Sequence, residues 1–274
     1  SLREGAVYTN VATTKDGDVW WEGLTKEPPP NLTDWQGKAW DPESGKPAAH
    51  PNSRFCFPID QVSTLSDNWA EPEGVEVDAI IFGGRRASNV PLALRSLNWE
   101  HGIFLGATIA SEQTAAAEGP IGKLRRDPFA MVPFCGYNMG DYFSHWLSFA
   151  KTLDPARLPT IFQVNWFRKD QDGKFLWPGF ADNMRVIQWI VGQLEGSDSS
   201  KPTPIGLVPK AEHLNLEGLE ISDDQLAELL DVDRSAWVRE AAEIGEFFEG
   251  FGDRLPTELT EELENLNSRL RAQV

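Results

Sequence analysis

The segment 164–183 carries five aromatic side chains within fifteen residues, interrupted by a charged turn. Its pattern predicts a short hairpin, with Phe167 and Phe175 flanking the turn, and then a Pro-Gly corner from which Phe180 returns. Rings held in this way can sandwich a flat ligand, because offset stacking favours planar partners. Asn183 adds a side-chain amide that can read the edge of a heterocycle. The alternative is that these rings are ordinary core, and the pattern leaves both interpretations open.

The chain has 274 residues, 41% of them hydrophobic and 24% charged, which suffices for one large domain or two small ones. Its formal net charge is −17, and this repels nucleic-acid phosphates and anionic membranes. We therefore expect no nucleic-acid or membrane partner, and any anionic ligand needs a local cluster of Arg or Lys. No window of about 20 apolar residues predicts a membrane-spanning helix. Cys56 and Cys135 have no metal-like spacing and are expected to be free thiols in a reducing compartment, the cytoplasm.

Hydrophobic patterning divides the chain into strand-like and helix-like segments. Residues 77–82 and 102–106 have the composition of strands, with a helix-like run over 91–97 between them. Apolar residues recur at helical spacing over 140–150 and 184–194.

The composition changes after Gly196, where the chain becomes acidic and helical. We expect an α/β domain over 1–196 and, packed on it, an acidic C-terminal helical segment over 197–274. Ser222 and Gln225 have the spacing of a capping box, which predicts a helix start.

Residues 50–56 place Asn52, Ser53 and Arg54 directly after a proline. Arg is well suited to a bidentate grip on carboxylate or phosphate. Asn52 could orient a substrate carboxylate by hydrogen bonding. The alternative interpretation is a turn with a surface ion pair.

Gly83, Gly84, Arg85 and Arg86 follow the predicted strand 77–82. Glycines allow close backbone approach, and α/β sheets place ligands at such strand ends. In a chain this acidic, the paired arginines indicate a phosphate role, with solvent-exposed charge as the alternative. A further basic run, 123–126, is expected to be a solvated strand edge.

Several catalytic patterns are absent from the sequence. Gly-Lys pairs begin at positions 37, 45, 122 and 173, and none is followed by the Ser or Thr of a Walker loop. The histidines show no metal-ligand spacing, and there is no nucleophile elbow. From the residues alone, the chain can bind a phosphorylated planar ligand but shows no complete catalytic apparatus and no metal site.

Taken together, these motifs resemble the GTP-dependent phosphoenolpyruvate carboxykinase family. The resemblance covers nearly the whole chain, is strongest over residues 8–194 and favours a bacterial member. It is carried by segments in the family's order, namely 50–56, 81–86, 111–118, 127–131, 133–138 and 165–183.

The resemblance implies an α/β fold, a mixed sheet with packed helices that forms the C-terminal nucleotide-binding part of that enzyme. The family converts oxaloacetate and GTP to phosphoenolpyruvate, GDP and CO2 in gluconeogenesis, by decarboxylation to an enolate that is then phosphorylated. The resemblance assigns the substrate site to Asn52, Ser53 and Arg54, with Arg54 also catalytic at the transferred phosphoryl group. It assigns GTP binding to Arg54, Arg85, Phe167, Phe175, Phe180, Ala181, Asp182 and Asn183, and the lid to Ala115 and Ala116.

Within that set, Arg85 would contact the phosphates, the three Phe rings would sandwich guanine, and residues 180–183 would read its edge. The family usually has Gly-Glu-Asn-Ser after the last pocket Phe, whereas this chain has Ala181-Asp182-Asn183-Met184. Ala181 therefore puts a Cβ where the base approaches the backbone.

The family's phosphate loop, reactive cysteine, Mn²⁺ and Mg²⁺ ligands and first substrate Arg precede the point where this chain begins. We therefore expect a C-terminal portion that is inactive alone and has the N-terminal half of the same enzyme as its partner. The alternatives are a non-catalytic guanine-nucleotide-binding module and a structural fragment.

Overall fold

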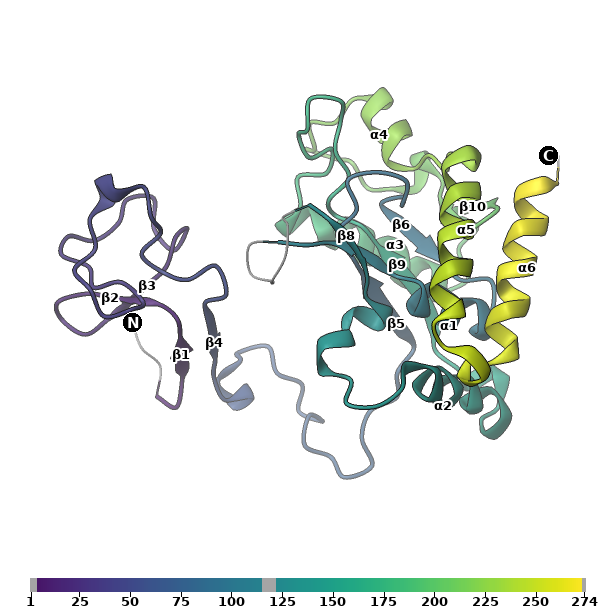
Figure 1. Ribbon diagram of the computed structural model, residues 1–274, viewed down its shortest axis with the longest axis horizontal. Helices are drawn as coiled ribbons and strands as arrows, with labels where there is room; N and C mark the ends of the chain where they lie inside the picture. The colour runs from purple at the N-terminus through teal and green to yellow at the C-terminus, as the bar shows by residue number, and fades with distance from the viewer. Residues whose placement is uncertain (1–3, 115–121, 273–274) are drawn as a thin grey trace. The chain divides into compact units, whose positions relative to one another are not determined.

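The computed structural model describes residues 4–114 and 122–272. Figure 1 shows its helices and strands. The candidate lid residues Ala115 and Ala116 lie outside the described residues. Within these ranges, no helix is both long and apolar enough to cross a membrane.

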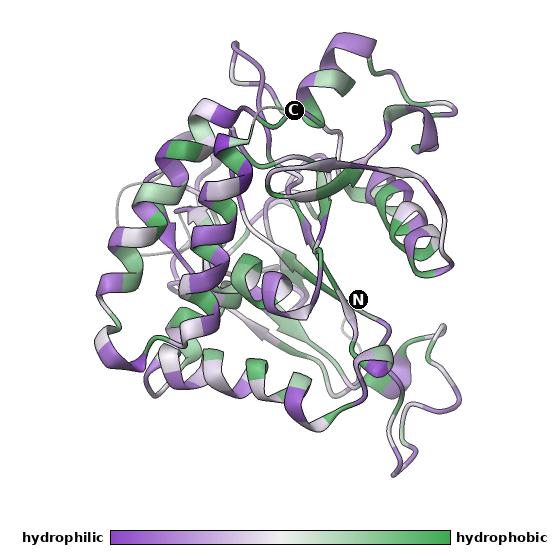
Figure 2. Cartoon of the chain, turned by 90° about the vertical axis from the view of Figure 1, so that its right-hand side faces the viewer, coloured by the Kyte–Doolittle hydropathy of each residue, from purple (hydrophilic) through white to green (hydrophobic). Residues whose placement is uncertain are grey.

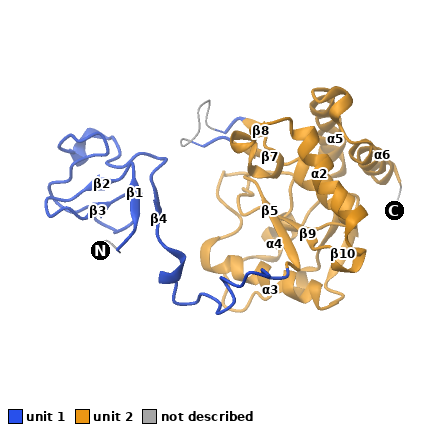
Figure 3. Cartoon of the chain, turned by 90° about the horizontal axis from the view of Figure 1, so that it is seen from below, with its two compact units in different colours: residues 1–76, 113–123 blue, residues 77–112, 124–274 orange. Residues whose placement is uncertain are grey.

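The chain divides into two compact units, which Figure 3 shows in different colours. Unit 1 comprises residues 1–76 and 113–123, and unit 2 comprises residues 77–112 and 124–274. This division differs from the one expected from composition, because the acidic segment from residue 197 onward lies wholly within unit 2.

Unit 1 is rich in loops and contains two short antiparallel ribbons. β1 (Val7–Thr9) pairs with β4 (Arg54–Cys56). β2 (Ala12–Thr13) pairs with β3 (Val19–Trp20) across a turn over residues 14–18. The buried apolar cluster of this unit is small and consists of Ala12, Trp20, Leu32 and Ala48.

Unit 2 is built on a five-stranded mixed sheet with the strand order β10-β11-β6-β9-β5. β5 (Ala79–Gly83) and β9 (Thr160–Val164) are parallel neighbours. β6 (Ala93–Arg95), β10 (Ser200–Thr203) and β11 (Gly206–Pro209) join by antiparallel pairing. The expected α/β fold with a mixed sheet is therefore confirmed.

Six α-helices of the described residues surround this sheet, together with a separate ribbon of β7 (Ala110–Glu112) and β8 (Leu124–Arg126). The helices are α1 (Trp99–Ala107), α2 (Met139–Thr152), α3 (Asn183–Leu194), α4 (Asp223–Leu229), α5 (Arg234–Glu249) and α6 (Thr257–Arg271). The helices expected over 140–150 and 184–194 are confirmed as α2 and α3, and α4 begins at the expected capping box.

Alternate side chains of the sheet enter two apolar clusters, one on each face. In β9, Ile161 packs with residues of α1, α2, α5 and α6, whereas Phe162 packs with residues of α3 and α4. Figure 2 shows hydrophobic segments in the sheet and, on the helices, hydrophobic segments alternating with hydrophilic ones. The sheet is thus covered by helices on both faces, which leaves the ends of its strands as the accessible places for a ligand.

Two sequence predictions were wrong, and they are neighbours in the chain. Residues 93–95 form strand β6 where a helix was expected, and residues 99–107 form helix α1 where a strand was expected. Ala93 and Leu94 are buried on opposite faces of the sheet. Hydrophobic periodicity cannot distinguish a strand that is buried on both faces from a buried helix. Gly102 lies against Ile161, so close that a Cβ would be 2.6 Å from its Cδ1. This glycine therefore marks close packing of a helix on the sheet.

His101 of α1 is a buried titratable group. It is 1% exposed, and its Nδ1 accepts a hydrogen bond from the backbone N–H of Leu97 at 3.0 Å. Burial and, to a lesser extent, the positive charge of Arg269 lower the pKa of His101 from 6.5 to about 3. The folded protein therefore holds a neutral imidazole over a range in which the unfolded chain binds a proton.

Below pH 6.5, we expect the free energy of unfolding to decrease as the pH is lowered. His101 should contribute up to about 1.4 kcal/mol per pH unit to this decrease. His101→Asn, whose side-chain oxygen can still accept from Leu97, should reduce that slope. The exposed His213→Asn is the control. Urea unfolding at pH 7 and pH 5 measures the slope, and an unchanged slope in His101→Asn would contradict a neutral His101.

Candidate functional site

The loops that follow β5 and β9 leave the sheet at the same edge. These strands are parallel neighbours in register, with Gly83 opposite Val164 at their carboxyl ends. The loop after β5 carries Arg85, and the loop after β9 carries Phe167. The crevice outside the carboxyl ends of parallel strands is the usual ligand position in α/β sheets.

The buried amide of Asn165 joins these two loops. It is 1% exposed, and its Oδ1 accepts hydrogen bonds from the backbone N–H of Arg86 and of Phe167, each at 3.2 Å. Its Nδ2 donates to the carbonyls of Arg86 and Val90, each at 2.9 Å. Both donors and the acceptor of the amide are therefore used, so the loop that carries Arg85 is fixed relative to the loop that carries Phe167.

The ribbon strand β7 supports the Arg85 loop from the other side. The backbone N–H of Arg85 donates to Ser111 Oγ at 2.9 Å, and its Nε donates to the Glu112 carbonyl at 3.1 Å. Glu112 Oε1 accepts from the backbone N–H of Ala87 at 2.7 Å. A Cβ at Gly84 would lie 3.2 Å from the Ala110 carbonyl oxygen. Gly84 was expected to allow a ligand to approach the backbone closely. In the structure, it allows the close approach of strand β7.

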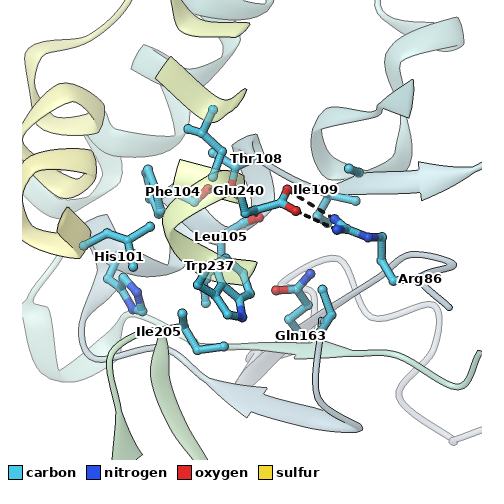
Figure 4. Close-up of a pocket in the computed structure, with 14 residues that line it drawn as sticks. Arg86, His101, Phe104, Leu105, Thr108, Ile109, Gln163, Ile205, Trp237 and Glu240 are labelled. Atoms are coloured by element: carbon cyan, nitrogen blue, oxygen red, sulfur yellow. Dashed lines mark hydrogen bonds and ion pairs between the residues drawn. The ribbon is translucent and has the colours of Figure 1, made fainter. Parts of the chain in front are cut away.

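A buried ion cluster connects this loop to the acidic helix α5. Glu240 binds Arg86 at 2.6 Å through Oε2 and Arg126 at 2.7 Å through Oε1, and Figure 4 shows the Arg86 contact beside a small cavity. The side chains of all three residues are at most 14% exposed. Arg86 is therefore committed to an internal carboxylate, and Arg126 was wrongly expected to lie on a solvated strand edge.

The cluster also determines the charge of Glu240. Burial by itself raises the pKa of the Glu240 carboxyl group, but the hydrogen bonds and charges of Arg86 and Arg126 outweigh burial. The net effect holds its pKa below the ordinary value of 4.5. Glu240 therefore stays ionised and paired at neutral pH.

The aromatic segment forms the predicted hairpin. Asp170 Oδ1 accepts from the backbone N–H groups of Asp172 and Lys174, and Lys169 bridges to Phe175. The rings of Phe167 and Phe175 meet edge to face, with centroids 6.0 Å apart and planes at 74°.

Exposure differs between the aromatic residues of this segment. Phe175 is 58% exposed and Phe180 is 95% exposed, whereas Trp177 is 1% exposed and belongs to the core. The core interpretation therefore holds for Trp177, whereas ligand binding by the exposed rings of Phe175 and Phe180 stays a prediction. Phe180 follows Gly179 and has a φ of 45°, a left-handed conformation that costs a non-glycine residue energy.

The corner after the hairpin is fixed by two side-chain contacts. Asp182 Oδ1 accepts from Arg185 Nε at 2.9 Å, and Asn183 Oδ1 accepts from Trp177 Nε1 at 3.0 Å. The preceding Ala181 lies in a 3₁₀ turn over Phe180–Asp182. All residues that were expected to contact the base lie on the segment 167–183 of unit 2, where Phe167 contacts Phe175.

Asn52, Ser53 and Arg54 form a separate group in unit 1. The backbone N–H of Asn52 donates to His50 Nδ1 at 2.9 Å, which confirms a turn at this place. Arg54 Nη1 donates to the Ser53 carbonyl at 2.7 Å, and both residues line a cavity of about 120 Å³ with Trp21. In residues 4–114 and 122–272, no three His, Cys, Asp or Glu side chains gather as metal ligands do.

We expect Glu240→Gln to lower the free energy of unfolding by about 3 kcal/mol, because two buried arginines would lose their counter-charge. Glu243→Gln is the matched control. It lies on the same helix 3.4 Å from Arg126, but its side chain is 58% exposed, so its loss should cost less than about 1 kcal/mol.

The same pair of variants tests the charge of Glu240. Because its folded pKa is depressed, its contribution is complete above pH 4.5 and is lost as pH falls through the lower folded value. The stability difference between wild type and Glu240→Gln should therefore shrink below pH 4.5. Urea unfolding at pH 7 and pH 3.5 measures both effects, and equal losses in the two variants would contradict the buried cluster.

A family model described as the phosphoenolpyruvate carboxykinase C-terminal P-loop domain matches residues 1–269. The phosphoenolpyruvate carboxykinase (GTP) of Renibacterium salmoninarum is 54% identical over 97% of this chain and 44% of its own length. Those of Paenarthrobacter aurescens and Chlamydia caviae are 51% and 53% identical, over 97% and 99% of the chain and 44% and 45% of their own lengths. The chain thus spans less than half the length of these relatives, and it belongs to the GTP-dependent phosphoenolpyruvate carboxykinase family.

Proposed function

We propose that this chain supplies the guanine-nucleotide pocket and part of the substrate site of a GTP-dependent phosphoenolpyruvate carboxykinase. The enzyme would convert oxaloacetate and GTP to phosphoenolpyruvate, GDP and CO2. This proposal rests mainly on the edge of the sheet in unit 2, where hydrogen bonds of Asn165 hold the Arg85 loop against the loop that begins the aromatic hairpin. A nucleotide has an anionic end and a flat aromatic end, and this edge offers a cation for the first and rings for the second.

Arg85 is the residue that we assign to the phosphates. Its backbone and Nε are held by Ser111 and Glu112, and within the described residues its two terminal nitrogens have no hydrogen-bond partner. A guanidinium oriented in this way can bind phosphate oxygens through both terminal nitrogens. The neighbouring Arg86 is neutralised by Glu240, so it stabilises the loop and does not bind the ligand.

We place the base against the aromatic hairpin. Phe167 and Phe175 touch one another, so no base fits between them in this arrangement. A base that stacks on one of these rings would meet the edge of the other. Phe180, with its ring almost fully in water, would close on the second face, and Ala181, Asp182 and Asn183 would meet the edge.

Asn52, Ser53 and Arg54 are the residues that we assign to oxaloacetate and phosphoenolpyruvate. In the proposed reaction the bond to the departing carboxylate breaks, its electron pair forms the enolate, and the enolate oxygen takes the γ-phosphoryl group while GDP leaves. The Arg54 guanidinium would stabilise charge on that phosphoryl group. The proposed lid around Ala115 and Ala116 would exclude water from the enolate.

The described residues offer no donor set that fits Mn²⁺ or Mg²⁺. We propose that the remaining length of the relatives supplies the metal ligands and the phosphate loop, as the partner of this chain. We place the enzyme in the cytoplasm, since Cys56 and Cys135 are both free thiols.

Calorimetric titration with GDP and with guanosine tests the two halves of the pocket. Phe175→Ala should weaken the binding of both ligands by about tenfold or more, because it removes a stacking ring. Arg85→Gln should weaken the binding of GDP by about tenfold and leave the binding of guanosine unchanged, because guanosine has no phosphate.

Phe134→Ala is the control for the loss of an exposed ring, since Phe134 is 84% exposed and lies outside the hairpin. A wild-type chain that binds neither ligand would refute the pocket. The chain alone should show no GTP-coupled decarboxylation of oxaloacetate in the presence of Mn²⁺, and turnover by it would refute the need for a partner.

A further inference from the structure

We propose that Trp177 is a positioning residue that sets the base preference of the site by fixing the side-chain amide of Asn183. Trp177 is buried and cannot itself touch a ligand. Because Asn183 meets a base only if the site holds a nucleotide, this role rests on the proposed function.

The hydrogen bond between these residues fixes which end of the amide faces the protein. Trp177 Nε1 lies 3.0 Å from Asn183 Oδ1. The two ends of an amide are easily confused in structures, but an indole N–H can only donate. The atom that meets it must therefore be the carbonyl oxygen. The NH2 group of Asn183 consequently points away from Trp177, and in the described part of the chain it has no protein partner.

The backbone beside Asn183 is held as well. Arg185 donates through Nε to Asp182 and through its terminal nitrogens to the carbonyls of Asn215 and Glu217, at 2.7 and 2.9 Å. The turn is thus anchored on one side by Arg185 and on the other by the buried indole. Asn183 therefore loses little freedom when a ligand arrives, which favours both affinity and selectivity.

An outward NH2 group selects for an acceptor on the base. Guanine and hypoxanthine carry a carbonyl oxygen at position 6, whereas adenine carries an amino group there, which is itself a donor. A free Asn could rotate its amide and accept from adenine. Held by Trp177, it would face adenine donor to donor, and such unpaired groups reduce affinity on the order of tenfold to a hundredfold.

Trp177→Phe tests this role because it keeps a buried aromatic ring and removes the N–H donor, together with part of the ring volume, for which the control below accounts. Binding of GDP, IDP and ADP is measured by calorimetry, which does not depend on tryptophan fluorescence. The wild type should prefer GDP and IDP to ADP. In the variant, that preference should decrease about tenfold. GDP and IDP should bind more weakly than to the wild type, and ADP should bind equally well or more tightly. IDP lacks the 2-amino group of guanine, so parallel losses for GDP and IDP assign the contact to position 6.

Trp189→Phe is the matched control. Trp189 is 3% exposed in the same apolar cluster, and its Nε1 donates to the Ser199 carbonyl at 3.2 Å. This variant also loses one buried indole hydrogen bond, but that bond does not involve Asn183. It should lose thermal stability and keep the wild-type ratio of GDP to ADP affinity.

A double-mutant cycle separates positioning from direct effects. Asn183→Ala should abolish the preference at position 6, and adding Trp177→Phe to it should change the ratio no further. Asn183→Asp keeps an oxygen that can accept from the indole and places a second acceptor outward. It should therefore weaken the binding of GDP and strengthen the binding of ADP. This variant leaves the buried Trp177 in place, so it remains informative if Trp177→Phe fails to fold.

The outcomes are distinguishable. An unchanged GDP-to-ADP ratio in folded Trp177→Phe overturns the positioning role and leaves the proposed function intact. Full additivity of the two substitutions overturns it as well. A wild-type chain that binds none of the three nucleotides overturns the proposed function, and the positioning role with it.

Discussion

Four hydrogen bonds on the buried amide of Asn165 hold together the loops after β5 and β9. A sheet can bring two strand ends to one edge, but it does not determine how the loops beyond them are arranged. Asn165 does so by acting as donor and acceptor for backbone groups of both loops. The separation between Arg85 and the aromatic hairpin is therefore fixed by the fold before any ligand is present.

The parts of the site that the sequence predicted depend on residues close together in the chain. The hairpin, the Pro-Gly corner and the capping box of α4 arise from patterns a few residues long. The exchange of helix and strand around residues 91–107 has the opposite origin. There, burial on both faces and the packing of Gly102 on Ile161 depend on a strand about sixty residues further along the chain, which local periodicity does not contain.

Asn165 and Glu240 were missed as supporting residues for the same reason. Asn165 bonds to Arg86 across 79 residues, and Glu240 reaches Arg86 and Arg126 across 154 and 114 residues. An Asn directly after a buried strand was the available signal for the first. Helical spacing from Trp237 and Ile244 places Glu240 beside the buried stripe of α5, but the arginines that it meets cannot be identified from local sequence. The acidic C-terminal segment was expected only to pack on the α/β domain, yet its Glu240 pairs with both Arg86 and Arg126.

The exposed ring of Phe180 has a thermodynamic consequence. The free protein keeps this large apolar side chain almost wholly in water, on a backbone conformation that is itself unfavourable. Ordered water around such a ring raises the heat capacity of the free state. A flat ligand that covers Phe180 and Phe175 releases that water, so the enthalpy of association becomes more negative as temperature rises.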